Sequence, residues 1–100
     1  MIEIKKDFLA TVKKIREEMG GDIYPRASMN KAQYAKGTAT INGGPGCTHE
    51  MARQILDSDH LFNFMRRQGA GAVIEITKDA NGKEVPYIRI GYMPEHLKSK

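Results

Sequence analysis

The glycine-rich segment 42–48 holds the residue types that most directly suggest chemistry. Its sequence is Asn-Gly-Gly-Pro-Gly-Cys-Thr, and apolar residues with helical spacing follow it. Glycines that lead into a helix N-terminus present free backbone N–H groups to an anion such as phosphate. The candidate anion-binding residues are Gly43, Gly44, Gly46 and Thr48, with Arg53 one turn into the helix as a supporting charge. The segment lacks the lysine of a Walker loop and the spacing of a dinucleotide fingerprint. We therefore favour the interpretation that it is a connecting loop whose glycines adopt positive φ.

Cys47 and His49 raise the question of catalysis in the same segment. A cysteine at a helix N-terminus can become a nucleophile when its pKa is lowered, but no third group is evident that would orient His49. The three histidines lack the spacing of metal ligands on one helix, and no pair of carboxylates stands out for acid–base work. We therefore interpret Cys47 as structural and predict a non-enzymatic protein without a metal site or a cofactor.

The charge of the chain permits an anionic partner without identifying one. Lys and Arg number 16 against 12 for Asp and Glu, which gives a net charge of +4, and no segment concentrates the excess. A basic surface for nucleic acid therefore has to be assembled by the fold. The candidate nucleic-acid-binding residues are Arg66, Arg67, Lys78, Lys83 and Arg89.

The composition is that of one globular domain over residues 1–100. With 40% hydrophobic and 28% charged residues, the chain is too apolar for disorder and too charged for a membrane protein. The sequence has no apolar run of about 18 residues and no apolar N-terminal segment, so we expect neither a membrane span nor a targeting signal. The single, unpaired Cys47 fits a reducing compartment, and we expect a cytoplasmic protein.

The elements that must position these residues begin with an N-terminal helix over residues 1–21. Its apolar face recurs at spacings of four and three. The residues of this face are Ile4, Phe8, Val12, Ile15 and Met19, with Leu9 widening it. Gly20-Gly21 then ends the helix, as glycine past the last turn usually does.

Residues 22–36 allow two interpretations. In one, Ser28 caps a short helix from Lys31 to Lys36. The inward residues would then be Met29, Ala32 and Ala35. In the other, a strand begins at Gln33 and runs to Ile41. Residues 38–41 have the β-branched alternation of a short strand in either case.

Residues 48–69 predict a pair of short helices. Thr48 or Cys47 caps the first, Ser58 caps the second, and Gly69 ends it. The apolar stripe of the second helix consists of Leu61, Phe62 and Met65.

Phe64 falls off that stripe, so we expect its ring to be exposed. An exposed phenylalanine beside two arginines is typical of a protein interface. Tyr87, on the outer side of the following hairpin, is the second candidate interface residue, and beside Arg89 it is also placed to stack on a base.

Residues 71–92 predict a β-hairpin, and 93–100 a polar tail. A three-residue loop over 80–82, with Gly82 left-handed, sets Ile74 opposite Ile88. We prefer this register because it places four isoleucines on one buried face. These are Ile74, Ile76, Ile88 and Ile90. Pro86 has no N–H donor, which predicts an edge strand or a free side there. The expected fold is α+β, a single small domain with two or three helices packed on a small antiparallel sheet.

The order helix, short strand, helix, helix, strand, strand resembles that of the winged helix-turn-helix family. The motif of that family has a small residue inside its first helix, a polar cap on the second, and two apolar anchors three residues apart. Those positions are Ala52, Ser58, Phe62 and Met65, within residues 48–67. Leu56 departs from the pattern, which has glycine at the turn. The resemblance implies DNA binding through the second helix, with the hairpin as the wing.

We therefore expect a small, nucleic-acid-associated binding protein of the DNA-binding regulator type. The alternative is a phage- or plasmid-type inhibitor that docks on a nuclease, a helicase or another nucleic-acid-processing complex. The small size of the chain, the lack of a catalytic constellation and Phe64 motivate this alternative. A third hypothesis is a phosphate or nucleotide binder that uses the segment 42–48.

Overall fold

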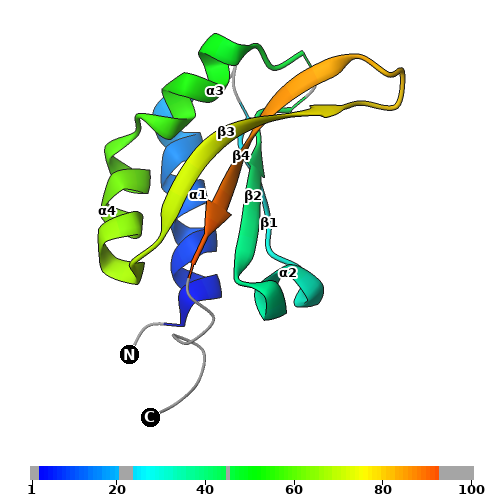
Figure 1. Ribbon diagram of the computed structural model, residues 1–100. Helices are drawn as coiled ribbons and strands as arrows, with labels where there is room; N and C mark the ends of the chain where they lie inside the picture. The colour runs from blue at the N-terminus through cyan, green and yellow to red at the C-terminus, as the bar shows by residue number, and fades with distance from the viewer. Residues whose placement is uncertain (1–2, 21–23, 45, 93–100) are drawn as a thin grey trace.

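The computed structural model describes residues 3–20, 24–44 and 46–92 (Figure 1). The described helices are α1 (Ile4–Met19), α2 (Lys31–Lys36), α3 (His49–Leu56) and α4 (Asp59–Gln68). The strands are β1 (Arg26–Ser28), β2 (Thr38–Asn42), β3 (Gly71–Lys78) and β4 (Glu84–Gly91), and they pair antiparallel in the order β1-β2-β4-β3. The predicted α+β fold is confirmed. The predicted tail over 93–100 lies outside the described residues.

Helices α1, α3 and α4 lie on one face of the sheet, and no other described helix or strand covers the opposite face (Figure 1). The apolar core lies between these helices and the sheet. It includes Phe8 and Ile15 of α1, Ile41 of β2, and Ile88 and Ile90 of β4, all of which are fully buried. Burial of such side chains is the main source of stability in a domain of this size.

Helix α1 confirms the predicted apolar face with one correction. Phe8, Val12 and Ile15 are buried, but Leu9 is 45% exposed and does not widen the face. The helix ends at Gly20, whose φ of 83° is a conformation that favours glycine.

The short helix α2 has the predicted bounds but a different cap. Asn30 Oδ1 accepts a hydrogen bond from Gln33 N at 2.8 Å, and Gln33 Oε1 accepts from Asn30 N at 3.0 Å, which is a capping box. Ser28, the predicted cap, instead donates to Gln33 Oε1. Ala32 and Ala35 are exposed rather than inward, because Tyr34 is the apolar α2 side chain that packs against the core. Of the predicted inward residues, Met29 is buried, and it precedes the helix.

Helix α4 confirms the predicted cap Ser58 and the predicted end at Gly69, but its buried face is one residue out of phase with the prediction. Phe64 is fully buried and its ring centroid lies 5.6 Å from that of Phe8, whereas Phe62 is 54% exposed. The expected exposure of Phe64 is therefore wrong. Leu61 and Phe64 have the same spacing as Phe62 and Met65, so spacing alone does not fix the phase.

The hairpin confirms the predicted register. Ile74 lies opposite Ile88, and Asp79 N donates to Lys83 O at 2.9 Å, which closes the loop over 80–82. Gly82 has the predicted positive φ, at 79°.

Two expectations about the hairpin strands need correction. Ile76 is 54% exposed, because the outer half of the hairpin projects past the helices (Figure 1). Strand β4 is central rather than an edge, but its pairing with β2 stops at Tyr87. On the side of β4 that faces β2, Pro86 therefore lies beyond the paired residues, which is the free side that the sequence predicts.

Candidate functional site

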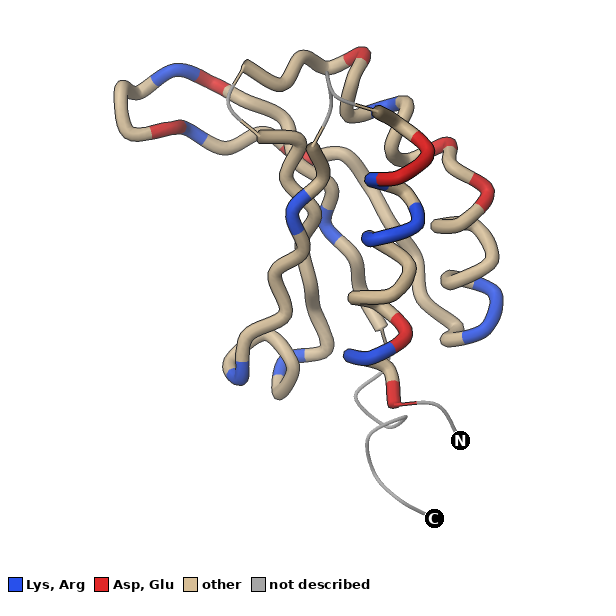
Figure 2. The backbone as a smooth tube through the Cα atoms, turned by 180° about the vertical axis from the view of Figure 1, so that it is seen from behind, with Lys and Arg blue, Asp and Glu red and all other residues tan. Residues whose placement is uncertain are grey.

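The five predicted nucleic-acid-binding residues fall into two groups. Arg66 and Arg67 are in the last turn of α4, whereas Arg89 is on β4 and Lys78 and Lys83 are at the end of the hairpin. The end of α4 and the hairpin loop lie at opposite ends of the molecule in both the front and the back view (Figure 1, Figure 2). The structure therefore does not gather these residues into one patch.

Arg67 is held by Asp7 of α1. Its Nε and Nη2 donate to the two carboxylate oxygens at 3.0 and 2.9 Å, and Gln68 Nε2 adds a third hydrogen bond of 2.7 Å to the same carboxylate. Burial raises the pKa of Asp7, but the hydrogen bonds from Arg67 and Gln68 outweigh it, so the pKa lies below its usual value. Arg67 thus joins α4 to α1, a structural role that the sequence did not indicate.

The remaining surface of α4 is poorly suited to a DNA groove. Asp57 and Asp59 are exposed at the start of the helix, where a recognition helix normally meets the bases. Carboxylates at this place repel phosphates. Arg66 lies at the far end, with its guanidinium carbon 5.9 Å from the centre of the Phe62 ring. The resemblance to winged helix-turn-helix domains stays a prediction.

The glycines of segment 42–48 have structural reasons to be glycine. A side chain at Gly43 would collide with the Cys47 sulfur, and Gly44 and Gly46 have φ values of 88° and 75°. Thr48 caps α3, since its Oγ1 accepts from Met51 N at 3.2 Å. These observations agree with the connector that the sequence favours, and the anion site stays a prediction.

The other side chains near this segment are also accounted for by the fold. Burial raises the pKa of the Cys47 thiol, which opposes a role as a nucleophile. Arg53, the predicted supporting charge, pairs with Asp57 one turn later at 3.5 Å. In the part of the chain that the structure describes, no three His, Cys, Asp or Glu side chains are grouped as metal ligands.

The uncovered face of the sheet, here called the outer face, gathers polar side chains from all four strands. Strand pairing sets the residues of this face, polar and apolar, in rows across the sheet. The rows are Arg26, Asn42, Tyr87 and Glu75; Ser28, Thr40, Arg89 and Val73; and Thr38, Gly91 and Gly71. Arg26, Arg89 and Glu75 are the charged members of these rows. The outer face therefore combines polar side chains, among them two arginines and one carboxylate, with the exposed apolar side chain of Val73.

Arg89 occupies the middle of the outer face and is held in a fixed position. Its Nε lies 3.0 Å from Glu75 Oε2, and Tyr87 donates its hydroxyl to Glu75 Oε1 at 2.8 Å. The hydrogen bonds from Tyr87 and then Arg89 lower the pKa of Glu75, so this carboxylate is charged at neutral pH. Tyr87, a predicted interface residue, is thus tied into the sheet rather than free.

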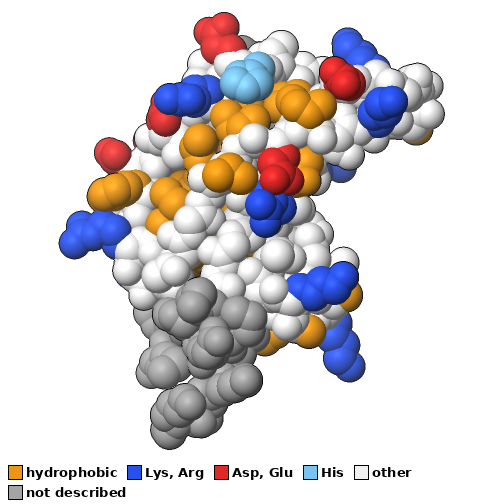
Figure 3. Space-filling view, in the orientation of Figure 1, with side chains coloured by type: hydrophobic (Ala, Val, Ile, Leu, Met, Phe, Trp, Pro, Cys, Tyr) orange, Lys and Arg blue, Asp and Glu red, His pale blue; other side chains and the backbone are white. Residues whose placement is uncertain are grey.

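Basic side chains flank the outer face at two ends. Lys83 is exposed in the hairpin loop, and Lys31 and Lys36 are exposed on α2. Figure 3 views this face and shows Lys and Arg side chains at the hairpin, in the middle of the sheet and beside α2. Lys78, by contrast, shares a strand face with Ile76 and lies opposite Glu84, because side chains alternate along β3.

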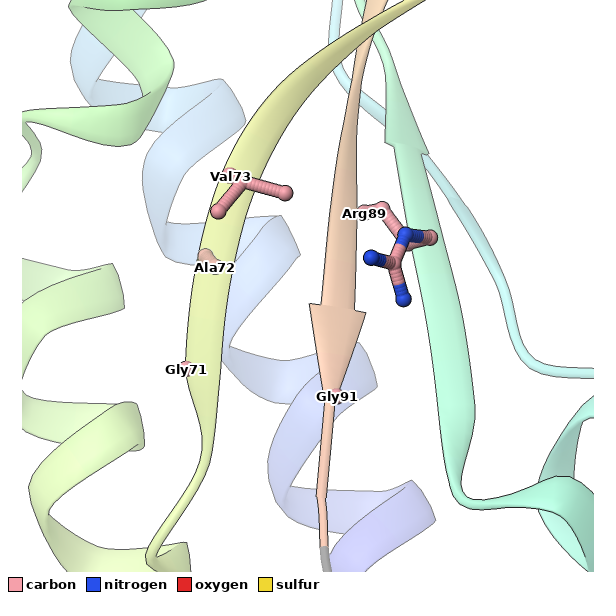
Figure 4. A pocket seen from close by; sticks show the side chains of 5 residues that line it. All are labelled: Gly71, Ala72, Val73, Arg89 and Gly91. Carbon is pink, nitrogen blue, oxygen red and sulfur yellow. The ribbon is translucent and has the colours of Figure 1, made fainter.

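A shallow hollow lies on the outer face beside Arg89. It is lined by Gly71, Ala72, Val73, Arg89 and Gly91 (Figure 4). Gly71 and Gly91 are directly opposite each other, as are Val73 and Arg89. No motif in the sequence marks the two glycines, although the predicted hairpin register sets them opposite each other.

Comparisons with protein-family models, with curated proteins and with solved structures find no match for this chain. None of the described helices has both the length and the apolar character needed to cross a bilayer. A functional assignment therefore depends on the geometry of the outer face and of α4.

Proposed function

We propose that the protein binds single-stranded nucleic acid on the outer face of its sheet. The observation that carries the proposal is the place of Arg89, which projects from a central strand into the middle of an uncovered polar face. Its side chain is 45% exposed and its guanidinium group is oriented by Glu75. An arginine oriented in this way offers its remaining N–H donors to acceptor atoms of a base.

The shape of the outer face favours a single strand over a duplex. The exposed start of α4, the helix that the sequence assigns to a major groove, carries carboxylates that repel phosphates. Unpaired nucleotides can lie flat on a sheet and use both their backbone and their base edges. Neutral hydrogen-bonding groups for such contacts lie near Arg89 on the same face, on Thr40, Ser28 and Asn42.

The charges around the outer face support the same ligand. Arg26 and Arg89 lie on the face, and Lys83, Lys31 and Lys36 lie at its ends. From residue 23 to residue 49 the sequence contains no Asp or Glu. A polyanion that crosses the sheet from the hairpin to α2 therefore meets basic groups at both ends of its path, with the Arg89–Glu75 ion pair between them.

Arg89→Ala is expected to weaken binding of a fluorescein-labelled 12-nucleotide RNA or DNA by about tenfold, as the loss of one well-placed arginine contact does. Fluorescence anisotropy measures this effect. If about four phosphates are neutralised, wild-type affinity should also fall roughly 50-fold between 50 and 200 mM salt. The matched control is Arg66→Ala, which removes the same charge from α4 and should leave affinity nearly unchanged. Loss of binding in Arg66→Ala but not in Arg89→Ala would place the ligand on α4 and contradict the proposal.

The pair Phe62 and Arg66 favours a second candidate, a protein-docking surface on α4. Phe62 is 54% exposed with the Arg66 guanidinium near its ring, and aromatic and arginine side chains are typical binding hot spots. This candidate keeps the alternative of an inhibitor that docks on a nucleic-acid-processing complex, with Phe62 in place of Phe64. The absence of binding to every oligonucleotide at low salt would favour it over the first proposal.

A further inference from the structure

The hollow on the outer face has a floor without side chains. Gly71 of β3 and Gly91 of β4 are paired in register, and Gly91 is also paired with Thr38 of β2. Among the residues that the structure describes, a Cβ atom added to either glycine would meet no atom within 4 Å. No described side chain therefore covers the backbone of these two adjacent strands at this point, where Figure 4 shows the two glycines side by side.

The walls of the hollow differ in character. Val73, which is 48% exposed, gives an apolar wall on β3, and Arg89 gives a cationic wall directly opposite on β4. Because Glu75 holds the Nε of Arg89, the two Nη groups are left at the other end of the guanidinium. Figure 4 shows this end turned down the strand toward Gly91.

The charges at the hollow favour a neutral ligand with hydrogen-bond acceptors over a phosphate. The ion pair with Glu75 leaves little net positive charge beside the hollow, and a phosphate on Arg89 would approach that carboxylate. A planar ring instead packs on Val73 and on the glycine backbone, while its acceptors meet the Nη groups. Guanine fits best among the bases, because its O6 and N7 accept two parallel hydrogen bonds from one arginine.

We propose that the hollow over Gly71 and Gly91 is a pocket for one unpaired base of a single strand, with guanine preferred through Arg89. The inference rests on the proposed function and deepens it. Basic groups around the outer face hold the backbone regardless of sequence, and the hollow selects the base that is set against Arg89.

The test compares nine-nucleotide strands that differ only at the central position. The strands are uridine tracts for RNA and thymidine tracts for DNA, each with guanine, adenine or the unchanged base at the centre. Fluorescence anisotropy measures the binding of each strand. We expect wild type to bind the guanine strand about tenfold more tightly than the other two. Gly91→Val should remove this preference and keep the weaker, salt-dependent binding of all strands. Backbone strain is not expected in this variant because the φ of Gly91 is not positive, and the added Cβ meets no atom of the described residues within 4 Å.

Thr77→Val on the same face, away from the hollow, is the matched control and should keep the preference. Thermal unfolding confirms that each variant folds, and Gly71→Val, which fills the other half of the floor, replaces Gly91→Val if needed. The base pocket is overturned if wild type binds all strands equally, or if Gly91→Val keeps the guanine preference. Either result leaves the proposed function in place. No binding of any strand at low salt overturns both.

Discussion

Phe64→Ala is expected to lower the free energy of unfolding by about 3 to 5 kcal/mol, the usual cost of emptying a fully buried phenylalanine site. The Phe64 ring is completely inaccessible to solvent and packs against Phe8, so its removal leaves a cavity between α4 and α1. Urea denaturation followed by circular dichroism measures the change as a shift of the midpoint at constant slope.

Phe62→Ala is the matched control for this change. It removes the same side chain from the same helix two residues earlier, but the ring is 54% exposed. We expect a change within about 0.5 kcal/mol, as for surface substitutions in general. Similar losses in the two variants, or a larger loss in Phe62→Ala, would contradict the orientation of α4.

Arg67→Ala is expected to destabilise the fold by about 2 to 4 kcal/mol at pH 7, because it leaves a mostly buried carboxylate without its cation. Asp7 is 9% exposed and would keep only the hydrogen bond from Gln68. Arg66→Ala removes the neighbouring charge without a buried partner, and its effect should stay within about 0.5 kcal/mol. The same denaturation experiment compares the two variants.

The effect of Arg67→Ala should depend on pH with a definite sign. Since the folded protein holds the pKa of Asp7 below its usual value, the ion pair stabilises the fold above the unfolded pKa of about 3.9. This contribution is lost as pH falls through the lower folded pKa. The difference in stability between wild type and Arg67→Ala should therefore shrink as the pH is lowered from 5 to about 3. A difference that stays constant over this range would show that the charge of Asp7 is not responsible.

Local signals were sufficient to predict much of the fold. The helix cap at Ser58, the helix end at Gly69 and the hairpin register set by Gly82 were predicted correctly, and Thr48 was one of the two caps predicted for α3. Each of these depends on a residue type whose conformational preference acts within a few positions of the chain.

Features that depend on distant contacts were missed. The three-residue strand β1 is too short to show a pattern, and it exists because Ala27 pairs with Ile41 of β2. The phase of α4 depends on Phe8 and Asp7 of α1, which meet Phe64 and Arg67 only in the folded chain. Sequence spacing carries no information on either contact.

The candidate site was predictable in part. Arg89 was selected from the sequence and lies at the centre of the outer face. The outer face itself was not foreseen, because it requires β1 and β2 to extend the hairpin into a four-stranded sheet. Gly71 and Gly91 could have been found by following the predicted register to the open end of the hairpin, where two glycines face each other.

The most direct test of the central claim is a ¹H–¹⁵N NMR titration of the protein with a 12-nucleotide single strand that contains guanine, at 50 mM salt. We predict that the largest shift changes occur at residues of the outer face, namely Thr40, Val73, Arg89 and Gly91, with small changes along α1 and α4. Changes centred on Phe62 and Arg66 of α4, or no changes at millimolar ligand, would contradict binding on the sheet.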